Sequence, residues 1–533
     1  MRNFFGIFLL MFIFCSQLSA QKQLTLEDFF VDGTFRTKGV YGLRSMNDGE
    51  HYTVLENNGT RIVKYSYKTG LPVATLLDLK TLEDSPVSRI DDYTFNADES
   101  RILICTNKKP IYRRSFTADY YLFDFKNKEI KPLSEGGSQR LATFSPTGLQ
   151  VAFVRDNNLF IHDIRFGSER QITRDGQYNH IINGAPDWVY EEEFAFNRAF
   201  EWAPDGSAIA YIKFDESDVR EFQMNMFEGQ SPALKQNELY PSNYVYKYPK
   251  AGEKNSKVSV YVYDVSDRTT TKMDTGEEDD IYLPRIRWTQ DPKKLAIIRL
   301  NRHQNKMEVL LANAKVGTIV PLYREENKYY IDESNLDNLV FLDNGTQFVI
   351  TSEKSGYMHL YLYDLNGRER QAITKGNFDI IDFYGYDPVR KLFYYSSYEE
   401  SPLEKYIYSI NEKGLKKKLT PVKGWNEASF SKNFNYYINV VSNTDTPPVT
   451  ALYNAKGKQV RVLEDNKAVK EAVKRHPDFI VGLKARMSSS VVGENGITPL
   501  ERAKAIQKEN GDLPLMEHIG NNPPNLDEIA ELL

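Results

Sequence analysis

Short runs of alternating apolar and polar residues recur along most of the chain, each followed by a polar turn that carries Asp, Asn or Gly. Such alternation is typical of half-buried β-strands, and the turns suit hairpins. Clear copies are "FSPTGLQVAFVRDNNLFIHDI" from Phe144, "WAPDGSAIAYIKFDES" from Trp202 and "FLDNGTQFVITSEKSGYMHLYLYDLNG" from Phe341. We therefore predict a chain built from repeated antiparallel strands.

The repeats group into units of similar length, and the number of units predicts the architecture. About eight units begin near Tyr41, Asp92, Gln139, Ala199, Ile281, Asn338, Asp382 and Gly424. The span 41–466 allows roughly 53 residues per unit, somewhat more than the ~40–45 of a compact propeller blade, so some units carry insertions. The largest insertion is 216–255, within the fourth unit. Closing the ring leaves only short sheet edges. The predicted fold class is all-β, an eight-bladed β-propeller.

The first twenty residues predict an export signal. Arg2 precedes an apolar stretch from Phe4 to Phe14, and Ala20 supplies the small residue that a signal peptidase needs. This pattern is typical of a signal peptide at 1–20, which directs the protein to the periplasm or the extracellular space and leaves no membrane span after cleavage. The alternative is an uncleaved anchor.

A lead-in at 21–40 separates the signal from the first unit. Its "LTLEDFF" predicts a short helix with Thr25 as the N-cap and Asp28 three residues later. After cleavage Cys105 is alone, so no internal disulfide is expected, and we interpret it as a small buried hydrophobic residue. The formal net charge of −5 and the lack of a Lys/Arg stripe argue against nucleic-acid binding.

The stretch "DWVYEEEF", Asp187 to Phe194, places three carboxylates among aromatic residues. Pro186 and the charges make it a poor strand, so a loop or a short helix beside a blade is expected. Two adjacent carboxylates with reduced hydration suit an ammonium group, because each accepts charge-assisted hydrogen bonds. The alternative is a solvated acidic helix start, since runs of charge usually face water.

Together, "DWVYEEEF", "WAPDGSAIAYIKFDESDV" and "YPKAGEKNSKVSVYVYD" resemble the N-terminal region of the dipeptidyl peptidase IV family, over about residues 24–466. The resemblance implies an eight-bladed propeller that caps an α/β-hydrolase domain in secreted serine peptidases. These enzymes release dipeptides whose second residue is proline or alanine. It further implies that the substrates are peptides with free N-termini, that no cofactor is needed, and that the 216–255 insertion contributes to a homodimer.

The resemblance also implies roles for individual residues. Glu192 and Glu193 match the two family glutamates that bind the α-ammonium group of the substrate. In "YRRSFTADY", Arg113 matches the arginine that contacts the peptide carbonyl; otherwise it is a surface charge. A guanidinium group can fork to a carbonyl oxygen, so the chemistry is consistent.

The catalytic motif of the family is not found in this sequence. The nucleophilic serine should lie on a G-x-S-x-G turn, and no such turn occurs in the 533 residues. We therefore assign no catalytic residue, expect no complete α/β-hydrolase domain, and predict that this chain alone is inactive.

The last residues carry a different pattern. After a junction at 467–475, residues 476–533 alternate as strand, helix, strand, helix, with "FIVGLKARM" and "LPLMEHIG" as parallel strands and "TPLERAKAIQKEN" as a helix. This βαβα segment resembles an internal fragment of a metal-dependent amidohydrolase barrel. The resemblance makes Lys484 and His518 secondary candidates as metal ligands, but two ligands do not make a dependable metal site.

The leading hypothesis is the propeller of a dipeptidyl peptidase IV-like serine exopeptidase, which admits substrates and recognises their N-termini. The alternative is a non-catalytic propeller that binds peptides or a partner protein. An amidohydrolase fused to a propeller is the third hypothesis, and its ligand set is incomplete.

Overall fold

The computed structural model describes residues 25–226, 241–443, 446–474, 483–486 and 515–518. It divides into two compact units: Gly39–Asp465, and a smaller unit that joins residues 1–38 with 466–533. The predicted signal peptide and the predicted helix of the C-terminal segment lie outside the described residues. No helix in the described ranges is long and apolar enough to span a bilayer.

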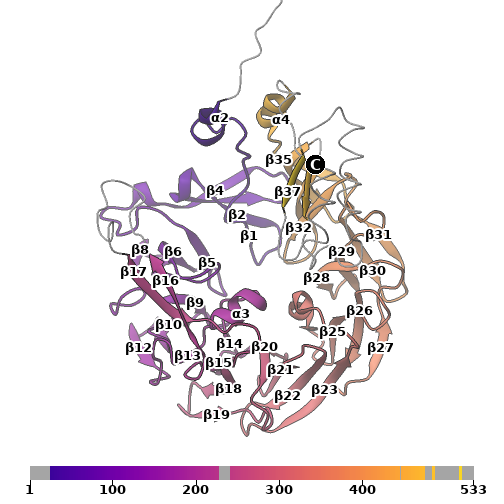
Figure 1. Ribbon diagram of the computed structural model, residues 1–533. Coiled ribbons are helices and arrows are strands. Elements are labelled where there is room, and N and C mark those ends of the chain that lie inside the picture. The colour runs from indigo at the N-terminus through magenta and orange to yellow at the C-terminus, as the bar shows by residue number, and fades with distance from the viewer. Residues whose placement is uncertain (1–24, 227–240, 444–445, 475–482, 487–514, 519–533) are drawn as a thin grey trace, which may run out of the picture. The chain divides into compact units, whose positions relative to one another are not determined.

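The larger unit is a ring of eight antiparallel sheets that follow one another in chain order (Figure 1). The first two blades are β1 (Arg44–Ser45), β2 (His51–Glu56), β3 (Arg61–Ser66) and β4 (Pro72–Asp78), then β5 (Asp92–Phe95), β6 (Arg101–Pro110), β7 (Phe116–Asp124) and β8 (Glu129–Pro132). The third blade is β9 (Arg140–Phe144), β10 (Gln150–Arg155), β11 (Asn158–Asp163) and β12 (Ser168–Gln171). The fourth is β13 (Ile181–Asn183), β14 (Phe200–Trp202), β15 (Ala208–Asp215), β18 (Lys257–Asp264) and β19 (Thr270–Lys272).

The other half of the ring has the same plan. The fifth and sixth blades are β20 (Ile281–Trp288), β21 (Lys294–Asn301), β22 (Lys306–Asn313) and β23 (Ile319–Glu326), then β24 (Val340–Phe341), β25 (Gln347–Ser352), β26 (His359–Asp364) and β27 (Glu369–Ala372). The seventh and eighth are β28 (Ile380–Asp387), β29 (Leu392–Ser397), β30 (Tyr406–Asn411) and β31 (Lys416–Lys418), then β32 (Trp425–Phe430), β33 (Tyr436–Asn443), β34 (Thr446–Asn454) and β35 (Gln459–Glu464). The predicted eight-bladed propeller is confirmed.

The central strands of the blades are buried on both faces, not only on one. Along β10, Val151 to Val154 are all inaccessible to solvent. Each central strand lies between two neighbouring sheets, so both of its faces meet apolar side chains.

Side-chain packing closes the ring between the first and the eighth blade. The rings of Tyr67 and Tyr436 stack with their centroids 5.5 Å apart. The Lys432 amide donates to the Ser45 hydroxyl across the same seam, at 3.1 Å. Each blade comes from one stretch of the chain, interrupted by a hairpin in the fourth blade, so no strand is exchanged between the two ends of the propeller.

The fourth blade departs from the predicted boundaries. We expected it to begin at Ala199, but its inner strand starts at Ile181 and is in two pieces, β13 and β14, which both pair with β15. A second interruption, residues 216–256, separates β15 from β18 and contains a hairpin of β16 (Glu221–Met226) and β17 (Ser242–Lys247). We call residues 216–256 the insertion.

Among its described residues, the smaller unit has two helices and a pair of strands. In α2 (Leu26–Phe30), Thr25 and Asp28 form the predicted capping box. The side chain of Asn466, which precedes α4 (Lys467–Lys474), bonds both the amide and the carbonyl of Lys38. The strands β36 (Leu483–Arg486) and β37 (Leu515–His518) pair in parallel, as the C-terminal pattern predicts.

Candidate functional site

The acidic stretch forms a short helix that interrupts the inner strand of the fourth blade. This helix, α3 (Trp188–Glu193), begins at Asp187, whose side chain accepts the Tyr190 amide at 2.9 Å as an N-cap. A carboxylate at this position satisfies an unpaired amide of the first turn. Because α3 is inserted between the two pieces of an inner strand, it lies inside the ring of blades (Figure 1).

The three glutamates of α3 have different environments. Glu191 is fully buried, the Glu192 side chain keeps 16% of its exposure, and Glu193 is exposed. Successive helical residues turn by about 100°, so adjacent side chains cannot share one environment. We expected the aromatic neighbours to remove water from Glu192 and Glu193; Glu192 is half-buried, but Glu193 is exposed. The aromatic residues three positions away on either side of Glu191 place it on the buried face.

Glu191 attaches α3 to the second blade. Its Oε1 atom accepts the amides of Arg114 at 2.6 Å and Ser115 at 2.8 Å. In return, the guanidinium group of Arg114 donates to the Glu191 carbonyl at 2.9 Å. These contacts hold the loop between β6 and β7, which carries Arg113, against the helix.

The structure brings together the residues that the sequence proposed from separate blades. Arg113 Nε donates to Glu192 Oε2 at 2.8 Å, and the Arg113 side chain remains 71% exposed. Glu193 makes no hydrogen bond or ion pair with any described residue, and is therefore open to a cationic ligand. We call Arg113, Glu192 and Glu193 the recognition site.

The fifth blade holds α3 from the other side. The Leu283 amide donates to the Tyr190 hydroxyl at 3.0 Å, and Arg285 Nη2 donates to the Phe194 carbonyl at 2.8 Å. Burial raises the pKa of the Tyr190 phenol well above its usual value. Arg285 is itself bound by both oxygens of Asp337, at 2.7 and 2.8 Å. Sequence reasoning missed Tyr190, Glu191 and Arg285.

A cavity of about 410 Å³ opens directly after α3. Residues 195–198 line it, together with parts of the inner strands of the third, fourth and fifth blades. Its charged side chains are Arg198, Arg285, Arg287, Glu201 and Asp337, so cations outnumber anions by one. Burial raises the pKa of Glu201. The cavity adjoins the end of α3, but Arg113, Glu192 and Glu193 do not line it.

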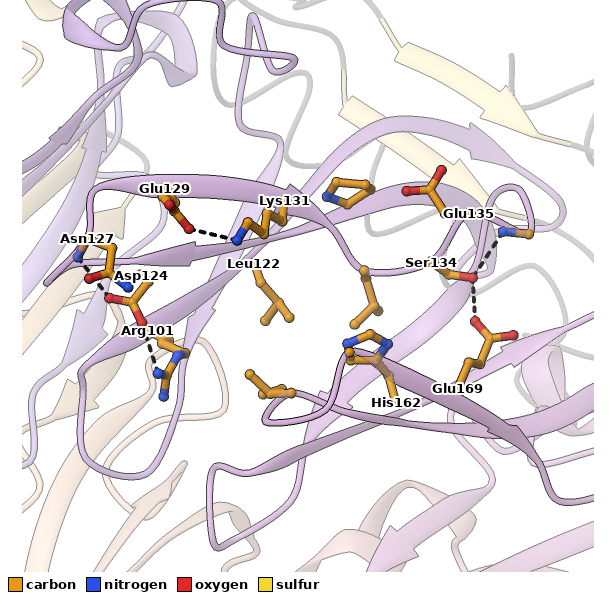
Figure 2. Close-up of a pocket in the computed structure, with 15 residues that line it drawn as sticks. Arg101, Leu122, Asp124, Asn127, Glu129, Lys131, Ser134, Glu135, His162 and Glu169 are labelled. Carbon is orange, nitrogen blue, oxygen red and sulfur yellow. Dashed lines mark hydrogen bonds and ion pairs between the residues drawn. The ribbon is translucent and has the colours of Figure 1, made fainter.

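A wider cavity, of about 760 Å³, lies between the second and third blades (Figure 2). Its charged groups are largely paired with one another, as in Arg101 with Asp124 at 2.9 Å and Lys131 with Glu129 at 2.7 Å. His162 points into it, and burial lowers the pKa of that imidazole. No residue of α3 lines this cavity, so its size alone does not mark the recognition site.

The two secondary metal candidates lie on neighbouring strands of the smaller unit. In the parallel register, Lys484 lies opposite Met516 and His518 lies opposite Arg486. Within the described ranges, no group of three or more His, Cys, Asp or Glu side chains could hold a metal ion. Metal binding by this segment stays a prediction.

Comparison with known proteins agrees with the blade count. A family model described as the dipeptidyl peptidase IV (DPP IV) N-terminal region matches residues 96–448. A probable dipeptidyl peptidase 4 of Aspergillus flavus is 29% identical over 403 residues, which cover 72% of this chain and 51% of that protein. The chain thus spans about half the length of the curated relatives it matches.

Two solved structures have the same fold. The crystal structure of Porphyromonas gingivalis dipeptidyl peptidase 4 matches with a TM-score of 0.80 and 41% identity, covering 85% of this chain and 63% of that one. A putative dipeptidyl aminopeptidase IV from Bacteroides ovatus matches with a TM-score of 0.64 over 80% of this chain and 60% of its own. At 21% identity, this second match supports the fold alone.

Proposed function

The chain belongs to the dipeptidyl peptidase IV family through its N-terminal region, and we propose that its propeller recognises the free N-terminus of a peptide for dipeptide release. Glu192 and Glu193 bind the α-ammonium group, and Arg113 binds the first peptide carbonyl. The observation that carries this proposal is the contact between Arg113 and Glu192, which unites residues 79 positions apart at one exposed site.

The recognition site has the charge that an ammonium group requires. Glu192 contacts Arg113 through Oε2, and no described residue bonds its Oε1, so that oxygen can accept a further donor. Glu193 supplies a second carboxylate. A peptide α-amino group has a pKa of about 7.7–8.0, so it is mostly charged at neutral pH. Acetylation removes that charge, and an acetylated peptide should bind less well.

The substrates of the proposed activity are peptides with proline or alanine as the second residue. The names of the relatives, which are dipeptidyl peptidases, support dipeptide release, whereas the preference for proline or alanine rests on the resemblance of the sequence motifs. If the site that binds the N-terminus lies at a fixed distance from the nucleophile, the bond cleaved is the one after the second residue. The 533 residues contain no G-x-S-x-G turn, so the nucleophile is not assigned here.

The test is binding of the tripeptide amide Ala-Pro-Ala, with a free or an acetylated N-terminus, to the purified chain by isothermal titration calorimetry. The free peptide should bind more tightly. Glu193→Gln keeps the shape but removes the charge, and should weaken binding of the free peptide by about tenfold, or about 1.4 kcal/mol. Glu277→Gln, at an exposed glutamate between the fourth and fifth blades, is the matched control. Equal binding of both peptides by the unmodified chain would contradict the proposal.

A non-catalytic peptide-binding propeller is the second candidate, favoured by the same recognition site and by the absence of a nucleophile turn in this sequence. The two candidates differ in hydrolysis. Joining the chain after Asp465 to a hydrolase domain of this family should restore dipeptide release from free N-termini under the first proposal. Binding without any release would support the second.

We also propose export and self-association. Residues 1–20 have the composition of a signal peptide. On β16 of the insertion, Phe222, Met224 and Met226 lie on one face and keep 36%, 40% and 42% of their exposure. A row of exposed apolar side chains on a two-stranded hairpin suits a homodimer contact. Sedimentation velocity of the chain and of Met224→Asp tests this proposal.

A further inference from the structure

The base of the insertion packs against both halves of the recognition site. Tyr248, just after β17, lies with its ring centroid 4.2 Å from that of Trp188, the first residue of α3. Tyr246, within β17, lies 6.0 Å from Tyr112, which precedes Arg113. The two aromatic contacts thus reach the helix that carries the glutamates and the loop that carries the arginine.

A buried polar contact attaches the far end of the insertion to the same helix. The Ser256 hydroxyl donates to Asp187 Oδ2 at 2.5 Å, while Asp187 Oδ1 accepts the Tyr190 amide. Ser256 and Asp187 keep only 2% and 5% of their exposure. One carboxylate therefore caps α3 and anchors the end of the insertion, so displacement of either element would break a buried hydrogen bond.

Further contacts stiffen the base of the insertion. Lys247 Nζ donates to the Val219 carbonyl at 2.8 Å, which joins the outgoing and the returning strand. The Tyr178 hydroxyl donates to the Val245 carbonyl at 2.8 Å and ties the hairpin to the connection between the third and fourth blades. Because the base is attached at these points, its position fixes the positions of α3 and the Arg113 loop. A hairpin on a flexible hinge would not have this effect.

We propose that the base of the insertion, through its described residues 216–226 and 241–256, is a positioning element of the recognition site. Tyr248 and Ser256 set the place of α3, and Tyr246 sets the place of the Arg113 loop. Together they hold Glu192 and Arg113 at the spacing that one peptide N-terminus spans. This inference rests on the proposed function, and it assigns the insertion a role inside the chain that does not depend on self-association.

The experiment compares Tyr248→Ala, Tyr248→Phe and Ser256→Ala in the full chain. The control is Phe166→Ala, because Phe166 is a 75% exposed aromatic residue of the third blade. The probes are the free and acetylated Ala-Pro-Ala amides. Aromatic pairs contribute about 0.5–1.5 kcal/mol, so Tyr248→Ala should weaken binding of the free peptide by about 2- to 10-fold. Tyr248→Phe keeps the ring and should restore binding, and Phe166→Ala should match the unmodified chain.

Hydrogen exchange gives a readout that does not need the peptide. The amides of Arg114 and Ser115, which bond Glu191, should lose protection in Tyr248→Ala while amides of the first and eighth blades keep theirs. Unchanged protection in this loop and in α3, or unchanged peptide affinity, would overturn the inference. If the unmodified chain does not prefer the free peptide, the proposed function fails, and the exchange result still decides whether the insertion positions α3.

Sedimentation velocity on the same samples separates positioning from assembly. If Tyr248→Ala weakens peptide binding with the association state unchanged, the insertion acts within one chain, as proposed. The other outcome is that peptide affinity falls only in samples in which the oligomer has dissociated. If that affinity equals the affinity of unmodified chain diluted until it dissociates to the same extent, the insertion acts through assembly and the inference is wrong.

Discussion

Glu191→Ala should be among the most damaging single changes at the recognition site, although Glu191 itself is inaccessible to solvent. Its Oε1 atom accepts two amides, from Arg114 at 2.6 Å and Ser115 at 2.8 Å. Alanine removes the acceptor and leaves both amides without a hydrogen-bond partner. The Arg113 loop then loses its attachment to α3.

The magnitude follows from these two bonds and one opposing effect. A hydrogen bond to a charged group contributes about 1.5–3 kcal/mol, so the pair is worth about 3–6 kcal/mol. Against this, Glu191 has no ion pair among the described residues, and its Oε2 lacks a hydrogen-bond partner there. Removing the buried charge recovers part of its desolvation penalty, although the buried Arg140 guanidinium then loses the compensating charge of Glu191. We therefore expect a net loss of about 3 kcal/mol in the free energy of unfolding.

Urea denaturation of Glu191→Ala, Glu191→Gln and Glu193→Ala measures this effect. Glu191→Gln keeps an oxygen that can accept the amides and should fall between the other two. Glu193 is exposed, and surface substitutions usually stay within about 0.5 kcal/mol, so Glu193→Ala is the matched control. If Glu191→Ala and Glu193→Ala were equally stable, Glu191 would not be the attachment that the structure indicates.

Three further predictions follow from other contacts. Tyr190→Phe deletes the hydroxyl that accepts the Leu283 amide and should lower the free energy of unfolding by about 1–3 kcal/mol in the same assay, because a buried amide is left unpaired. The chain alone should not hydrolyse X-Pro or X-Ala p-nitroanilides, and turnover that a serine-directed phosphonate blocks would refute this. Burial and the nearby charge of Asp187 raise the pKa of Glu216 to about 8, above its usual 4.5. Folded-state protonation therefore stabilises the protein fully below about pH 4.5, and this contribution is lost as the pH rises through about 8. Glu216→Gln should flatten that part of the stability profile measured by urea denaturation, and an unchanged profile would contradict the assignment.

The architecture could be predicted because it repeats. The same strand-and-turn pattern occurs in eight copies. An error in placing one copy therefore does not change the predicted number of blades. The predicted starts at Asp92 and Ile281 coincide with the first residues of β5 and β20. The fourth blade was misplaced because α3 splits its inner strand. The three-residue piece β13 is too short to show an alternation.

The environment of the recognition site could be predicted only in part. The resemblance to the family proposed Arg113, Glu192 and Glu193, and the structure places these residues together. The resemblance could not show which glutamate is buried. The three glutamates are identical in the sequence, and burial depends on the orientation of α3. That orientation comes from Leu283 and Arg285 on another blade, which no local pattern connects to the helix.

The interrupted strand explains how a ring of sheets can carry a helical site. The two pieces β13 and β14 pair with adjacent parts of β15, and Ile212 between these parts bonds Gly184 on one side and Ala199 on the other. The ladder is therefore kept, and residues 185–198 leave the strand as a loop that carries α3 inside the ring. Contacts from the second blade, the fifth blade and the insertion hold α3 in place. The position of Glu192 is therefore set by three elements distant in sequence, and changes in any of them should alter recognition without altering the propeller.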